Sequence, residues 1–168
     1  MSDNIKIGSK IIEGGTAYEV FKIKNTKNGN GTQRVVFYKP CFDNSNSNDI
    51  VCSIPEHNIT PPDMRKPVSK KEMEEVFIFL SKKTTNNAEV DIMKSKDVFR
   101  LNDIFKTAEV LRDVFKEKLL KGEEFSKSKR DLMDASVGKM VEEIALVYRV
   151  SLEGAKKKLF VALDSSSK

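Results

Sequence analysis

The segment Phe105-Lys-Thr-Ala-Glu-Val-Leu-Arg-Asp-Val-Phe115 stands at the centre of the stretch that decides the fold, residues 102–163. Apolar residues recur through it at steps of three and four, a spacing that lays one apolar stripe along an α-helix. The stripe consists of Ile104, Ala108, Leu111, Phe115 and Leu119. Asn102 precedes the stripe and is predicted to cap the helix, since its side chain can accept a free backbone N–H. Lys121-Gly122 is predicted to end it.

Similar patterns predict further helices on both sides of this one. A helix starting near Ser126 or Ser128 is expected to bury Met133, Val137, Met140, Ile144 and Val147. A last helix after Ser151 is expected to bury Leu152, Ala155, Leu159, Phe160 and Leu163. Upstream, Ser69 and Glu72 form a capping box for a helix that buries Met73, Val76, Phe77 and Leu80. A short helix from Ala88 would carry Val90, Ile92, Met93 and Val98.

The first third of the chain reads differently, because β-branched and aromatic residues alternate between turn signals over residues 5–54. Strands are predicted near residues 10–12, 17–24, 33–41 and 49–53, with a tight turn at Gly14-Gly15 and a hairpin loop over residues 25–32. We expect these strands to curl into a small barrel. About fifty residues is marginal for a core of its own, so docking on the helices should help.

A proline cluster, residues 61–67, separates the two patterns and predicts an accessible linker. The sequence therefore predicts a two-domain α+β protein. Residues 1–64 form the barrel, and residues 65–168 form an all-α domain of about five helices.

Composition narrows the class of protein. The chain has 168 residues, a net charge of +5, and 39% hydrophobic and 33% charged residues. No apolar run approaches the roughly 18 residues of a membrane span, and the N-terminus lacks the features of a secretory signal, so we expect a cytoplasmic protein. Two cysteines and one histidine fit neither a disulfide framework nor a zinc site.

No enzyme signature is present. The sequence lacks nucleotide-binding glycine motifs and paired histidines, so we expect a protein without catalytic activity, cofactor or metal. Glu142-Glu143 is interpreted as part of a solvated helix face, since catalytic carboxylates need a cleft and a perturbed pKa.

Several segments together resemble the CarD/CdnL family, bacterial proteins that bind RNA polymerase. The helical part of the resemblance lies in residues 108–115, Ser126 to Met133, and Glu142-Glu-Ile-Ala-Leu146. The N-terminal part lies in Ile7-Gly8-Ser-Lys-Ile-Ile12, Gly15-Thr-Ala-Tyr-Glu-Val20, Val35-Val-Phe-Tyr38 and Val51-Cys-Ser-Ile-Pro55. The resemblance implies a Tudor/SH3-like barrel that holds the polymerase β subunit, and a helical domain that approaches promoter DNA.

The resemblance also suggests site residues. The polymerase-binding set would be Lys22, Lys24, Asn25, Lys27 and Ser53. Better-known relatives carry arginines at the positions matching Asn25 and Ser53. The family's tryptophan, which wedges into the minor groove beside the melted promoter, falls near Ala88, and this chain has no tryptophan. Val90, Ile92 and Phe99 are apolar and are expected to lie in the core instead.

Basic residues could still contact phosphates without reading bases. The DNA-binding set would be Lys82, Lys83, Ala88, Lys94, Lys96 and Arg100. A solvated charged face is the competing interpretation for the lysines of both sets.

These expectations combine into a monomeric CarD/CdnL-like transcription regulator, localised to the nucleoid through RNA polymerase. It would contact promoter DNA independently of sequence and modulate open-complex stability. Two alternatives stay open: a polymerase-bound adaptor without the DNA wedge, and a general nucleic-acid-binding protein without a polymerase partner.

Overall fold

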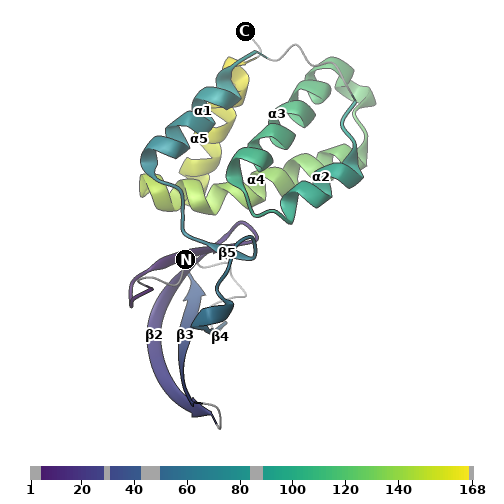
Figure 1. Ribbon diagram of the computed structural model, residues 1–168. Helices are drawn as coiled ribbons and strands as arrows, with labels where there is room; N and C mark the ends of the chain where they lie inside the picture. The colour runs from purple at the N-terminus through teal and green to yellow at the C-terminus, as the bar shows by residue number, and fades with distance from the viewer. Residues whose placement is uncertain (1–4, 29–30, 43–49, 84–88, 167–168) are drawn as a thin grey trace.

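The computed structural model describes residues 5–28, 31–42, 50–83 and 89–166. An antiparallel sheet comes first, and five α-helices follow it (Figure 1). The α+β class is therefore confirmed, with the strands and the helices in the expected order. No helix among the described residues combines the length and the apolar character needed to cross a bilayer.

The sheet has five strands in the order β4-β3-β2-β1-β5 and curls into a half-barrel. The strands are β1 (Lys10–Glu13), β2 (Thr16–Asn28), β3 (Gly31–Pro40), β4 (Cys52–Pro55) and β5 (Met64–Arg65). The hairpin of β2 and β3 is longer than predicted. Residues 25–32 were expected as a loop, but the strands pair as far as Asn28 and Gly31. These residues are polar, but their backbone groups pair across the hairpin, and Thr26 Oγ1 donates to the Gln33 carbonyl at 3.2 Å. The hydrogen bonds extend the strands in spite of the polar composition.

A small core fills the concave side of the sheet. It consists of Ile5, Ile11, Val20, Val36, Tyr38, Ile59 and Met64. Arg34 of β3 covers one side of it: its guanidinium donates to the Ile5 carbonyl and to Glu56, each at 2.6 Å. Glu56 begins the 3-10 helix η1 (Glu56–Asn58). Arg34 therefore ties the N-terminal segment and η1 to the sheet.

The helices are α1 (Lys70–Ser81), α2 (Ile92–Phe99), α3 (Ile104–Lys121), α4 (Lys127–Tyr148) and α5 (Leu152–Ser165). The predicted capping box of Ser69 and Glu72 is present. The starts predicted for α4, near Ser126, and for α5, after Ser151, are also confirmed, and both serine side chains cap their helices. Gly122 ends α3 with a φ of 53° and begins the 3-10 helix η2 (Gly122–Glu124). The prediction for the start of α3 was wrong, because Asp103 accepts the capping bonds instead of Asn102.

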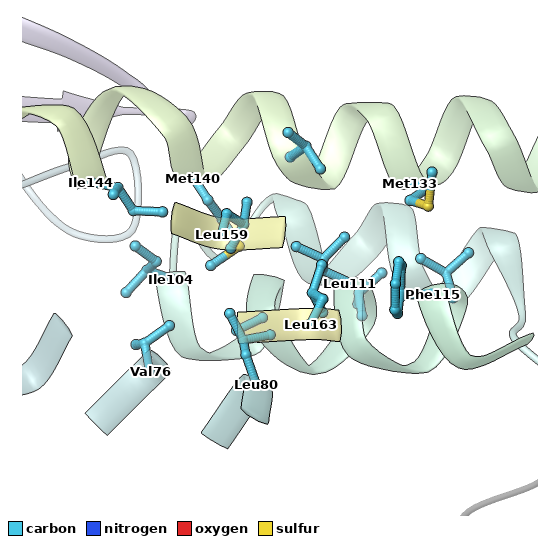
Figure 2. Packing of buried hydrophobic residues seen from close by; sticks show 14 of the residues in the cluster. Val76, Leu80, Ile104, Leu111, Phe115, Met133, Met140, Ile144, Leu159 and Leu163 are labelled. Carbon is cyan, nitrogen blue, oxygen red and sulfur yellow. The ribbon is translucent and has the colours of Figure 1, made fainter. Parts of the chain in front are cut away.

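The predicted stripes meet in one helical core (Figure 2). Its labelled members are Val76, Leu80, Ile104, Leu111, Phe115, Met133, Met140, Ile144, Leu159 and Leu163. Leu119 is an error in the prediction, since it is 53% exposed. At that end of α3 the buried position is taken by Glu117, which pairs with Lys129 of α4. Leu119 follows Glu117 by two residues in the helix, so its side chain points to nearly the opposite face of α3.

The sheet rests directly on α4. A Cβ added to Gly15 would lie 2.6 Å from the Cα of Lys139, so the two backbones touch there. The Ala17 N–H donates to Glu142 at 2.7 Å, and Lys139 Nζ donates to the Gly14 carbonyl at 2.8 Å. Glu142 is thus an interface residue, not part of a solvated face.

Glu143, its neighbour, is fully buried, and the prediction of a solvated face was also wrong for it. Its carboxylate accepts two bonds from the Arg65 guanidinium, each 2.6 Å, and one from the Val68 N–H at 2.8 Å. Arg65 also donates to the Asn102 carbonyl. Arg65 belongs to β5 and Glu143 to α4, so this pair joins the sheet to the helices.

Asn102 completes the junction. It is buried, has a φ of 48°, and donates from Nδ2 to the carbonyls of Ile12 and Asp63, at 3.0 and 3.1 Å. The expected accessible linker is therefore docked in its second half, where Met64 is 2% exposed. The predicted boundary between residues 64 and 65 falls inside β5.

Candidate functional site

The five residues of the predicted polymerase-binding set are all exposed, but they do not share one face of the sheet. Lys22 lies opposite Phe37, and Phe37 lies opposite Ser53, so Lys22 and Ser53 belong to one row across three strands. Lys24, two residues further along, is on the same face. That face points away from the small core, since Ile23 pairs with buried Val36 on the other side.

Asn25 and Lys27 alternate onto the opposite face of the hairpin. Lys22, Lys24 and Ser53 therefore form one convex surface, and the other two lie apart from it. Phe37 joins this surface: it is half-buried, and Lys22 Nζ lies 5.7 Å from its ring centroid. We call Lys22, Lys24, Phe37 and Ser53 the convex row.

The convex row ends at β4, an edge strand. Among the described residues β4 pairs with β3 alone, so its other edge carries backbone groups without a strand partner. Ile50 and Val51 lead into β4 and are 48% and 58% exposed. Exposed β-branched residues beside a free strand edge suit the addition of a strand from another protein. Sequence reasoning missed them. The available signal was two consecutive apolar residues at a strand end, which alternation cannot both bury.

The predicted DNA-binding set is split between two places. Lys82 and Lys83 follow the end of α1, whereas Lys94, Lys96 and Arg100 lie on or just after α2. Figure 1 shows α2 on the side of the helical domain away from α1. Ala88 lies outside the described residues.

On α2 the cations are accompanied by acids. Arg100 pairs with Asp97 at 3.0 Å, and Lys94 lies 4.0 Å from Asp91, which also caps the helix. These exposed pairs are weak in water, yet they lower the net positive charge of the surface. The α2 surface is therefore only mildly basic, and it offers phosphates fewer uncompensated charges than the sequence suggested.

The apolar residues of this region mostly face inward. Four of them pack against the helical core: Val90, Ile92, Val98 and Phe99. This confirms the expectation for Val90, Ile92 and Phe99. Met93 is the exception, because its side chain is 70% exposed on α2. It shares one helix face with Lys96 and Arg100, at helical steps of three and four. Met93 on α2 and Leu101 just after it, 52% exposed, are thus exposed apolar groups beside the described cations.

A buried charge network holds the chain that leads into α2. Glu117 of α3 accepts from Lys129, from Lys121 at 2.8 Å and from the Val90 N–H at 3.0 Å. Burial alone would raise the pKa of Glu117, but these donors outweigh it and bring the pKa to about 2. Lys129 also binds Glu89 at 2.9 Å. The network fixes residues 89 and 90 against α3 and α4, and so sets the position of α2.

Comparison with known proteins adds no assignment, since neither the family models nor the sequences of curated proteins match this chain. Among the described residues, no three His, Cys, Asp or Glu side chains lie together as metal ligands would. The candidate sites are therefore two surfaces, the β4 edge with the convex row and the exposed face of α2.

Proposed function

We propose that this protein is a CarD/CdnL-like transcription regulator, which docks on the RNA polymerase β subunit through a Tudor/SH3-like half-barrel. The order of a five-stranded antiparallel sheet followed by five helices is compatible with the domain order that this resemblance implies. The proposal depends mainly on one observation, the β4 edge with its flanking Ile50 and Val51.

Strand addition would supply the affinity at that edge. A partner strand would pair with the backbone of β4. Its side chains on the convex face would meet Ser53, and Val51, two residues earlier, continues the same face. The lysines of the convex row would favour an acidic partner surface and accelerate association.

Docking of the sheet would then orient the helical domain relative to polymerase. With the sheet fixed on polymerase, the junction of Arg65 and Glu143 holds α2 at one position relative to it. Met93, Lys96 and Arg100 would approach upstream promoter DNA without reading bases. A protein that binds the open complex more tightly than the closed one shifts the population toward the open state.

The first test is binding of the full-length protein to an isolated polymerase β lobe. Val51→Glu introduces a charge beside the β4 edge and should weaken binding by about tenfold or more, since it desolvates a carboxylate against the added strand. Leu120→Glu is the matched control, because Leu120 is 67% exposed on α3, in the helical domain. Equal affinities for the two variants, or no binding of the wild type, would refute the docking model.

A second candidate function is that of a polymerase-bound adaptor without DNA action. The neutralising partners Asp91 and Asp97, and the absence of tryptophan, favour it. The measurement is DNA affinity as a function of salt. Charge reversal of Lys96 should weaken binding and reduce the salt slope by about one if α2 contacts phosphates. A slope that Lys96→Glu leaves unchanged supports the adaptor.

A further inference from the structure

A groove in the helical domain, on the side away from α2, is separate from both surfaces described above. It runs between α1 and α5, which lie side by side in Figure 1, and has a volume of about 640 Å³. Half-buried Phe77, Tyr148 and Ala162 line it. The rings of Phe77 and Tyr148 meet edge to face, with centroids 5.7 Å apart.

Apolar side chains also remain exposed on both of its rims. Ile78 of α1 is 54% exposed and Val161 of α5 is 59% exposed. Apolar side chains grouped on both rims of an apolar groove mark an interaction site more often than isolated ones do. The groove therefore offers a continuous apolar strip between two helices.

Charge identifies the occupant. Lys157 and Lys158 of α5 line the same groove, and Lys158 Nζ lies 5.3 Å from the Tyr148 ring centroid. On the α1 side the lining residues Phe77, Ile78 and Ser81 carry no charge. The charged residues of the lining therefore both lie on α5, and both are cations.

We propose that this groove is the docking site for an acidic amphipathic helix of a partner protein. Its apolar stripe would fill the space between Ile78 and Val161, and its carboxylates would lie along α5 beside Lys157 and Lys158. This is the helix-in-groove mode of recognition, in which apolar side chains at helical spacing supply the contact.

Other occupants fit less well. An extended strand would need backbone partners, and the N–H and C=O groups of α1 and α5 are already bonded within their helices. A symmetric contact between two copies would bring two sets of the same lysines to one interface, which costs electrostatic energy. The proposal does not depend on polymerase binding, because the groove shares no residue with the β4 edge or α2.

The test is a selection from a displayed library of short helical peptides on the full-length protein. We expect enrichment of peptides with apolar residues at steps of three and four and a net negative charge. Lys157→Glu should weaken the best enriched peptide by about tenfold. Lys156→Glu is the matched control, since Lys156 is exposed on the same helix but does not line the groove.

Val161→Glu should abolish the binding, because it removes an apolar contact and adds a like charge beside the acidic peptide, and it should fold normally because Val161 is exposed. Three outcomes would overturn the proposal. They are enrichment without acidic character, equal effects of Lys157→Glu and Lys156→Glu, and a failure to enrich any peptide. Two results of other experiments would also overturn it. Saturable uptake of a fatty acid would identify a lipid as the occupant, and a dimer in sedimentation that a charge at Val161 disrupts would identify a second copy of the chain.

Discussion

Gly15 sets how closely the sheet can approach the helices. Its φ of 95° is unfavourable for any residue with a side chain, and the space for a Cβ is occupied by the backbone of Lys139. We predict that Gly15→Ala lowers the free energy of unfolding by about 3 kcal/mol, through backbone strain and overpacking. The measurement is urea unfolding.

The preceding residue provides the control. Gly14 also has a positive φ, 57°, but nothing lies within 4 Å of an added Cβ. Gly14→Ala should cost only about 1 kcal/mol, the strain of the left-handed conformation alone. If the two variants lose the same stability, the contact of Gly15 with Lys139 contributes nothing to the fold.

Single residues also show where sequence reasoning ended. Glu143 and Asn102 were interpreted from their neighbours, as a solvated carboxylate and a helix cap. Their actual partners are 78 and 90 residues away, on Arg65 and Ile12. A local sequence pattern cannot predict a hydrogen bond between residues so far apart in the chain. A carboxylate that will be buried therefore cannot be told from an exposed one until the position of its partner is known.

At the scale of elements, the network of Glu117 and Lys129 gives a prediction about pH. The folded-state pKa of Glu117, about 2, is below its ordinary value of 4.5. Its ionised form therefore stabilises the fold above pH 4.5, and that contribution is lost as the pH falls from 4.5 toward 2. We predict that Glu117→Gln costs about 2–3 kcal/mol at neutral pH and much less near pH 2.

The comparison is made by urea unfolding of wild type and variant across this window. Glu123→Gln is the control, since Glu123 is exposed in η2. Its effect should be small and constant with pH. A loss for Glu117→Gln that is as large at pH 2 as at pH 7 would show that packing, not charge, explains the role of Glu117.

Elements whose information is local were predicted well. The capping box of α1, the starts of α4 and α5 and the main apolar stripes agree with the structure, because capping and helical spacing act within a few residues. The length of the β2–β3 hairpin was not predicted correctly, since pairing between the strands extends them into polar residues. That error also affects the candidate site. A loop at Asn25 gives no reason to separate it from Lys24, whereas in a strand the two side chains point to opposite faces.

At the scale of the whole molecule, the angle between the sheet and the helices could not be predicted from the sequence. It depends on a buried ion pair, Arg65 with Glu143, and on backbone contacts around Gly15. Buried ion pairs can be replaced by apolar residues at little cost in stability. Their value is then orientation, which the proposed function requires if the sheet binds polymerase and α2 reaches DNA.

We therefore predict different effects for single and double replacements of this pair. Glu143→Met leaves the Arg65 guanidinium uncompensated and should cost about 3 kcal/mol in urea unfolding. Arg65→Met with Glu143→Met should cost about 1–2 kcal/mol, because the Val68 N–H and the Asn102 carbonyl lose partners, and so does the exposed Lys66 carbonyl, which water can reach. The double variant should still bind the β lobe, since β4 is unchanged.

The lifetime of open complexes formed with polymerase then tests orientation. In the double variant the sheet and the helices are no longer held by a bidentate bond. The longer lifetime that the proposed function predicts for the wild type should therefore be largely lost. The matched control is Arg34→Met with Glu56→Met, which removes a pair within the sheet part, 2.6 Å long, and leaves the junction intact. This control should retain the lifetime effect. If the junction variant retains it too, the helices act without a fixed direction, and the adaptor function becomes the better account.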